Sequence, residues 1–218
     1  MTQTLIIYTG TYLYGFAPEH LAIVASSPII GVLFAPIFVT KMSKRYDKKH
    51  TFMLCMVLGS IFGFSQPIAF LFGFFETLDI TARVSFIYLM NGISQIFFIG
   101  LYIIVDSMLS DTIDQHELDT GRREEGLYFA AGSFAQKASF GLGAFVAGIG
   151  LDVIRFPQGA NPADVPIDAL TGLAMFAGPV SMVMLLSSLF VIRAYPLNQK
   201  EHARITQAIH DMKTEGAG

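Results

Sequence analysis

Charged residues are scarce in this sequence, and the scarcity excludes a water-soluble domain. Asp, Glu, Lys and Arg make up 14% of the 218 residues, against about 25% in soluble domains. Hydrophobic residues make up 53%, and the mean hydropathy is +0.54. Lipid must cover this much apolar surface, so the bilayer is the expected solvent. The net charge of −3 rests on few residues, and no nucleic acid is expected as a partner.

Catalytic and metal-binding patterns are also missing. Cys55 is the single cysteine, so neither an intrachain disulfide nor a Cys-based metal site can form. The five histidines show no metal-ligand spacing, and there is no HExxH, no GxSxG and no deep pair of acids. We therefore expect no catalytic residues, no metal site and no cofactor. Residues 1–4 carry no basic stretch, so no cleavable signal peptide is expected.

What the sequence does contain is a series of long apolar windows. A spanning helix needs about 20 mostly apolar residues. The first window is short and begins almost at Met1, as though the chain began partway through a helix, which favours a truncated product. We predict one six-helix transmembrane domain over residues 1–194 and a polar tail over 195–218, with a short surface helix at 200–213. The helices are expected at about 4–17, 21–40, 51–75, 84–109, 127–153 and 169–194.

The loops between these windows differ in charge. Loops 41–50 and 110–126, together with the tail, hold eleven basic residues, whereas the loops on the other side hold only Arg83 and Arg155. Basic residues accumulate on the cytoplasmic side of membrane proteins. The asymmetry predicts a multi-pass protein of the cytoplasmic membrane with both termini in the cytoplasm.

One lysine lies where a charge is expensive. Lys137 lies ten residues into the 127–153 window, about 15 Å deep at a rise of about 1.5 Å per residue. A charge near the bilayer midplane costs at least about 2.5 kcal/mol, so its side chain should face protein or a water-filled cavity. Snorkelling to the headgroups is the alternative, but the distance is too long. Small residues recur every four positions around it and allow close helix approach: Ala135, Ser139, Gly143 and Ala147.

A polar stripe follows one face of the 84–109 window. Its members are spaced by four, seven and four residues, which places them on one side of a helix: Asn91, Gln95, Tyr102 and Asp106. Hydrocarbon would penalise such a face. It should therefore line a solute cavity or make hydrogen bonds to another helix, and both interpretations stay open. Asp106 lies close to the cytoplasmic end and can also be partly solvated.

Aromatic residues and prolines mark the first three windows. Tyr8, Thr11 and Tyr12 share one face, which suits either a sugar, through rings beside hydroxyls, or an interfacial aromatic belt. Pro28 and Pro36 interrupt the second window, and Gln66–Pro67 interrupts the third. Such prolines kink helices and free carbonyls.

Loop 110–126 carries acids in a helical spacing. Asp111, Asp114 and Glu117 recur every three residues, which predicts that the preceding helix continues beyond the membrane. Gly121 would end that helix. The double arginine that follows, beside further acids, can form an ion-pair network that latches one conformation. A solvated loop that merely obeys the charge rule is the alternative.

This loop and the helix after it resemble the signature of a known family. The run SDTIDQHELDTGRREEGLYFAAGSFAQKASFGLGAFVAGIGL at 110–151 resembles that of the glycoside–pentoside–hexuronide cation symporters, the melibiose-permease-like branch of the major facilitator superfamily. The basic run KMSKRYDKK is similar to the loop between the second and third helices of each half in that superfamily. The matching positions of the signature are Asp111, Asp114, Thr120, Gly121, Arg122, Arg123, Glu125, Gly126, Phe134, Gln136 and Lys137.

The resemblance implies an all-α membrane protein, a six-helix bundle that forms the C-terminal half of a major facilitator fold. Such proteins import a sugar or a similar small polar solute with Na⁺ or H⁺ by alternating access. Lys137 would lie near the cation site, with Asp106 as a shallower coupling candidate, and loop 110–126 would gate the cytoplasmic side. The family's cation-binding carboxylates lie in the N-terminal half, which this chain lacks. A second six-helix half, as a separate chain or a second copy, is the expected partner.

Two further function classes compete with this interpretation. A non-transporting membrane scaffold would use the same helices only to bind partners. A transporter of lipid-like solutes would share the fold, because related transporters carry lysolipids. An intramembrane enzyme is not expected.

Overall fold

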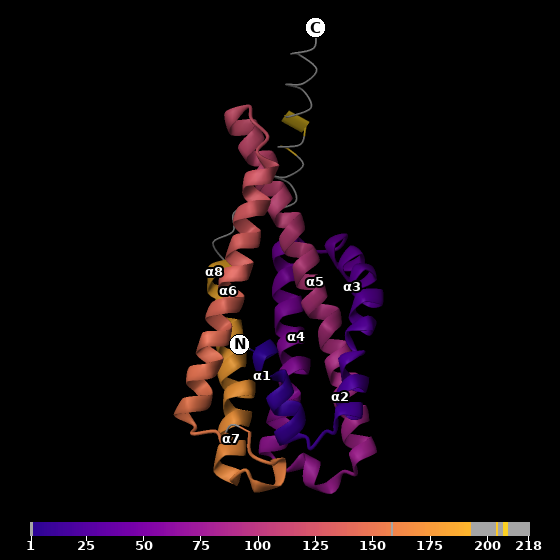
Figure 1. The fold of residues 1–218 in the computed structure, drawn as a ribbon. Helices are drawn as coiled ribbons and strands as arrows, with labels where there is room; N and C mark the ends of the chain where they lie inside the picture. The colour runs from indigo at the N-terminus through magenta and orange to yellow at the C-terminus, as the bar shows by residue number, and fades with distance from the viewer. Residues whose placement is uncertain (1, 158, 193–203, 205–206, 209–218) are drawn as a thin grey trace.

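The described chain is helical throughout. The computed structural model describes residues 2–157, 159–192, 204, 207 and 208, and these form helices, turns and no strand. The long helices run side by side (Figure 1), and five helical segments of the described chain are long and apolar enough to cross a membrane. The predicted all-α membrane fold is confirmed. The tail at 195–218, with its expected helix at 200–213, lies almost wholly outside the described residues.

The N-terminal helix is short and changes its winding. α1, Thr2–Tyr8, runs directly into the π-helical segment η1, Thr9–Leu13. The backbone N–H of Tyr14 donates to the carbonyl of Thr9 at 3.1 Å, which is the five-residue spacing of a π turn. Gly15 follows with a φ of 68°, a left-handed conformation that ends the helix cheaply only for glycine.

Prolines lie at a helix start and inside helices in the next two spans. α2, Pro18–Ala25, and α3, Pro28–Ser43, form one 26-residue span, and Pro28 stands at the start of α3, where no N–H is needed. α3 continues through Pro36, so the interruption expected there is corrected. α4, Lys48–Leu71, continues through Pro67, so the interruption expected at Gln66–Pro67 is corrected. Pro67 removes only the helical donor of the Gly63 carbonyl.

α5, Ile80–Thr120, is the longest helix and follows the short 3-10 turn η2, Phe74–Thr77. Its first turn is capped by Asp79, whose carboxylate accepts from the Ala82 N–H at 3.3 Å. Its 41 residues span about 60 Å, roughly twice the hydrocarbon thickness. The helix therefore extends well beyond the membrane, as the spacing of the acids predicts.

α5 ends at Gly121 and α6 leads back along it. Gly121 has a φ of 70° and donates its N–H to the Glu117 carbonyl at 2.8 Å, the expected C-terminal cap. α6, Glu125–Val153, forms the second arm of a hairpin that protrudes beyond the other labelled helices (Figure 1). The last span consists of α7, Ile167–Met175, the π-helical η4, Phe176–Val180, and α8, Ser181–Ile192; the 3-10 turn η3, Pro162–Asp164, precedes it.

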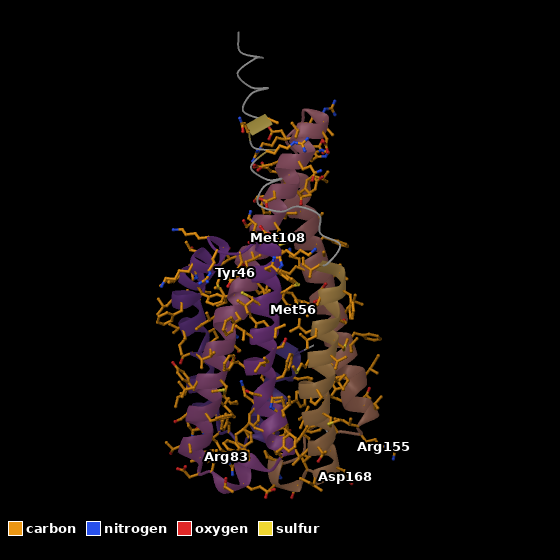
Figure 2. All side chains as sticks on the ribbon, turned by 180° about the vertical axis from the view of Figure 1, so that it is seen from behind. Tyr46, Met56, Arg83, Met108, Arg155 and Asp168 are labelled. Atoms are coloured by element: carbon orange, nitrogen blue, oxygen red, sulfur yellow. The ribbon has the colours of Figure 1, made fainter. Side chains whose placement is uncertain are left out.

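Two apolar clusters hold the bundle together. One joins η1, α5, α6 and α7 and includes Leu13, Ile87, Leu151 and Leu173. The other joins α3, α4 and α5 around buried Cys55. Arg83 and Arg155 lie near one end of the bundle, with Tyr46 and Met108 toward the other (Figure 2). The two basic residues of the sparsely charged side thus share one end of the helices.

Candidate functional site

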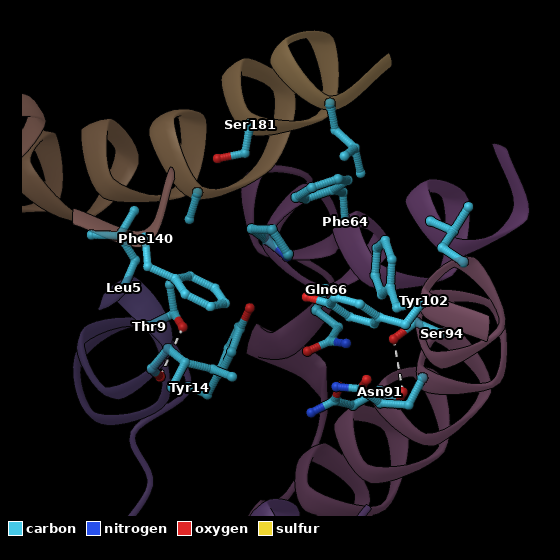
Figure 3. A pocket seen from close by; sticks show the side chains of 18 of the residues that line it. Leu5, Thr9, Tyr14, Phe64, Gln66, Asn91, Ser94, Tyr102, Phe140 and Ser181 are labelled. Atoms are coloured by element: carbon cyan, nitrogen blue, oxygen red, sulfur yellow. Dashed lines mark hydrogen bonds between the residues drawn. The ribbon is translucent and has the colours of Figure 1, made fainter. Parts of the chain in front are cut away.

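A cavity with a volume of about 680 Å³ lies among α1, η1, α4, α5, η4 and α8. Phe140 of α6 also contributes to its wall (Figure 3). Among the described residues that line it, none is charged. Apolar side chains form much of the wall, and the polar contributors are Thr9, Tyr14, Gln66, Asn91, Ser94, Gln95, Tyr102 and Ser181.

Most of the predicted polar stripe lies on this wall. Asn91, Gln95 and Tyr102 line the cavity, each from α5. Asn91 is eleven residues from the start of α5, about 16 Å along the helix, so this part of the wall lies near the middle of the span. Asp106 is exposed and does not line the cavity. Three of the four stripe residues therefore lie together on the wall, and the carboxylate of Asp106 lies apart from them.

The serine and threonine hydroxyls of the wall are tied to their own helices. Ser94 Oγ donates to the Asn91 carbonyl at 2.7 Å, and Thr9 Oγ1 donates to the Ile6 carbonyl at 3.1 Å (Figure 3). Ser181 Oγ donates to the Phe176 carbonyl at 2.7 Å. Each oxygen keeps lone pairs with which it can accept a further hydrogen bond. The wall can thus pair with donors on a solute.

Tyr8 and Tyr12, the candidates for either a sugar contact or an interfacial aromatic belt, do not line this cavity. Their rings stack at 6.0 Å, and both meet the edge of Phe156, at 5.7 and 5.0 Å. The Tyr12 hydroxyl donates to the Ala160 carbonyl at 3.2 Å. These contacts fasten the first helix to the loop after α6. The placement of these two tyrosines on the main cavity is therefore corrected, because Thr9 and Tyr14 occupy it instead.

Lys137 lies on an exposed stretch of α6. Every residue from 130 to 142 is exposed, although these residues lie in the middle of an apolar span. The ammonium group of Lys137 makes no hydrogen bond or ion pair with the described residues, and Lys137 does not line the cavity. The expected protein or water surroundings of this lysine are thus not supplied by the described part of the chain.

The predicted ion-pair network forms around Arg123. Its guanidinium contacts Glu117 and Glu125 at 2.6 Å and Asp114 at 3.1 Å. The hydrogen bond to Glu117, followed by that to Glu125, raises the pKa of Arg123 above its ordinary value. A raised pKa keeps the cation charged at every physiological pH. One arginine thereby joins the end of α5 to the start of α6.

Thr120 shapes the turn that presents this arginine. Its hydroxyl donates to the His116 carbonyl at 2.7 Å and accepts from the Arg122 backbone N–H at 3.3 Å. Together with the left-handed Gly121, this bond fixes the direction of the chain between the helices. Arg122 itself is exposed.

A second ion pair joins the start of α4 to the extension of α5. Lys48 Nζ lies 2.7 and 2.8 Å from the two carboxylate oxygens of Asp111 and 3.4 Å from the Ser107 carbonyl. The Asp111 side chain is 6% exposed, so the pair is largely shielded from water. The first turn of α4 and the acidic extension of α5 are therefore held together.

Comparison with known proteins decides the family. A family model described as MFS/sugar transport protein matches residues 1–199. The chain belongs to this family. Its members are transporters and not enzymes, and the resemblance drawn from residues 110–151 is confirmed at family level. Membership makes the chain a multi-pass membrane protein that lies in the lipid bilayer.

Individual relatives in this sugar transport family are symporters and permeases. The uncharacterized symporter YjmB of Bacillus subtilis is 28% identical over 95% of this chain and 42% of its own length. A candidate sulfoquinovose importer of Escherichia coli is 27% identical over 86% of this chain and 36% of its own length. The lactose permease of Lactobacillus delbrueckii subsp. bulgaricus is 22% identical over 95% of this chain and 31% of its own length. The chain thus spans less than half the length of these relatives.

Several cavity residues of this family member are not among those predicted from the sequence. Ser94 follows Asn91 by three residues and could have been found on the same face. Gln66 is predicted from the sequence only as part of a helix interruption with Pro67, and not as a cavity residue. Tyr14 and Ser181 join the wall through the π-helical turns beside them, and no sequence periodicity predicts such turns.

Proposed function

We propose that this chain forms the C-terminal half of a secondary active transporter. It moves a sugar or a similar small polar solute together with Na⁺ or H⁺, by alternating access. The observation that carries the proposal is the mid-span cavity, whose wall combines the amides of Asn91 and Gln95 with the hydroxyl of Tyr102. Hydrogen-bonding groups among aromatic and apolar side chains suit a ring with polar edges and apolar faces.

The need for a second half follows from α6. A bare lysine in lipid would cost at least about 2.5 kcal/mol, and small residues beside it permit close helix packing. A second six-helix body, within a longer chain or in another chain, covers this face and supplies a carboxylate to Lys137. The same carboxylate takes part in binding the coupling cation. Asp106, which is exposed, is the weaker coupling candidate.

The ion-pair network supports a gating role for the α5–α6 hairpin. Arg123 holds three carboxylates within this half, and Lys48 holds Asp111. A second half that offers basic residues to Asp114 or Glu125 competes for these acids when the cytoplasmic side closes. The network then exchanges partners between the two conformations. The hairpin end of the bundle then faces the cytoplasm, because the basic loops gather there.

Uptake into membrane vesicles tests the proposed function. The full chain is expressed alone and with the N-terminal six helices of YjmB, and uptake of radiolabelled lactose, methyl galactoside, sulfoquinovose and a lysolipid is followed with and without a Na⁺ or H⁺ gradient. We expect gradient-driven uptake of a sugar only when both halves are present. Uptake of the lysolipid and of none of the sugars would show that the transported solute is lipid-like and not a sugar. An inserted, correctly paired chain that moves none of these solutes would refute transport and leave a membrane scaffold.

A further inference from the structure

Two buried polar side chains on the cavity wall come from elements outside the predicted stripe. Gln66 of α4 is 8% exposed, and Tyr14, directly after η1, is 4% exposed. Both line the cavity. Figure 3 shows Gln66 between Tyr14 and Asn91 in this view. Polar groups from three separate segments of the chain thus line the cavity, beyond the face of α5 alone.

Neither the Gln66 amide nor the Tyr14 hydroxyl has a hydrogen-bond partner among the described side chains and backbone groups. The Ser94, Thr9 and Ser181 hydroxyls of the same wall all do. A buried polar group without a partner costs about 1–3 kcal/mol. Within the described residues, the one completely enclosed polar side-chain atom without a partner is Ser27 Oγ. The polar atoms of Gln66 and Tyr14 therefore reach the cavity and not a sealed interior.

The backbone around the pair is irregular on both sides. η1 immediately precedes Tyr14, and η4 packs against Pro67, because a Cβ added to Gly178 would lie 3.1 Å from the Pro67 ring. π-helical turns occur frequently at functional sites. Pro67 also deprives the carbonyl of Gly63, another wall residue, of its helical donor. The same region thus offers an amide, a phenol and a freed carbonyl.

We infer that Gln66 and Tyr14 form a second hydrogen-bonding subsite, which takes uncharged hydroxyl groups of the transported solute. This inference rests on the proposed function. An amide and a phenol each donate and accept, as a sugar hydroxyl does. The described wall contains no cation, so a carboxylate or sulfonate placed here would be desolvated without a counter-charge. The subsite therefore favours a neutral glycoside over a sulfonated one.

Cysteine labelling tests the position of the subsite before any transport is measured. Gln66→Cys is introduced into the full chain, paired with the second half in vesicles, and reacted with a small polar methanethiosulfonate. Native Cys55, on the same helix and 0% exposed, is the internal control. We expect rapid labelling at position 66, slowed by lactose and methyl galactoside but not by sulfoquinovose. Labelling no faster than at Cys55 overturns the subsite, whatever the uptake result.

Protection separates the subsite from the proposed function. If lactose protects Asn91→Cys but not Gln66→Cys, a solute site exists and the subsite is overturned. If none of the sugars protects either position and wild-type vesicles take up none, the proposed function fails and the subsite with it. Protection of position 66 by sulfoquinovose and lactose alike overturns the preference for neutral solutes.

Conservative variants supply the energetic test. Gln66→Leu and Tyr14→Phe should each raise the KM for the neutral glycoside by about tenfold, with little change in maximal rate. Ser60→Ala is the matched control on α4, because Ser60 donates to the Met56 carbonyl at 2.7 Å and does not line the cavity. A deoxy-glycoside that lacks the hydroxyl in question should lose no further affinity in Gln66→Leu. Equal losses for every solute would instead indicate a structural role.

Discussion

α5 and α6 follow one another in the chain but meet opposite surroundings. In the most apolar window of α5, 39% of residues are buried, against 17% in α6. α3 approaches α5 so closely that a Cβ on Gly31 would lie 2.7 Å from the backbone of Gln95. Along α6, Gly141 and Gly148 have nothing within 4 Å of such a Cβ. α5 is thus the internal centre of this half, and α6 is its uncovered edge.

Exposure alone does not distinguish α6, because the α7–α8 span is equally bare at 17%. The difference lies in chemistry. The described part of that span carries no charge after Asp168, which is what a lipid-facing helix requires. α6 carries Lys137 in mid-span. Contact with lipid accounts for the exposed surface of α7–α8. The charge on α6 instead requires a polar protein surface beside it.

The largest expected effect concerns Lys137, the exposed lysine in the middle of α6. Lys137→Ala should lower gradient-driven uptake by the paired halves about a hundredfold, a loss of about 2.7 kcal/mol in transition-state stabilisation, because the partner carboxylate loses its cation. The isolated chain should insert at least as well as before, since a charge leaves the span. Ser139→Ala, exposed on the same helix, is the control. Undiminished sodium- or proton-driven uptake in Lys137→Ala would contradict the role.

The next effect concerns α5, the packed helix, near the end that carries the hairpin. Asp111→Asn leaves Lys48 without its carboxylate partner and should destabilise the chain by about 2–3 kcal/mol, less than for a fully buried pair because Lys48 is partly exposed. Denaturant unfolding in detergent measures the change. Asp119→Asn, exposed on the same helix, should change stability by less than about 0.5 kcal/mol. Equal effects of the two would show that the ion pair stabilises nothing.

Glycine substitutions compare the packed surface of α5, which Gly31 of α3 contacts, with the exposed surface of α6. Gly31→Ala places a methyl group against the α5 backbone, which cannot move aside, and should cost about 1–3 kcal/mol of unfolding free energy. Gly141→Ala meets open space and should be neutral or stabilising by up to about 1 kcal/mol. Gly141→Leu should leave the isolated half unchanged but weaken its association with the second half in co-purification. If the association is not weakened, α6 is not part of the interface with the second half.

The sequence predicts the parts of this molecule that depend on periodicity and charge. The end of α5 at Gly121 follows from a spaced row of acids and a glycine cap, and the Arg123 network follows from charges close in the chain. The placement of Asn91 and Gln95 on one wall follows from helical spacing. These features are local, so a single helix is enough to derive them.

Features that depend on how helices meet escape the sequence. Tyr12, a candidate for either a sugar contact or an aromatic belt, instead donates to Ala160, 148 residues away, and no local pattern encodes that contact. The π turn of η1 rotates Tyr14 onto the wall, one position beyond where a regular helix would present it. Pro67 was expected to break α4, but its ring is accommodated against η4. Tertiary packing decides each of these cases.

The smallest expected effect lies in the turn that joins the two helices. Gly121 has a φ of 70° and open space around it, so Gly121→Ala adds only the strain of a left-handed alanine, about 1 kcal/mol. Gly126→Ala, also in open space but in the first turn of α6, should instead stabilise the hairpin by up to about 1 kcal/mol. Hydrogen exchange of the Gly121 N–H, bonded to Glu117, reports the local opening. Opposite changes in protection would locate the strain in the turn, whereas equal changes would mean that the Arg123 ion pairs alone hold α5 and α6 together.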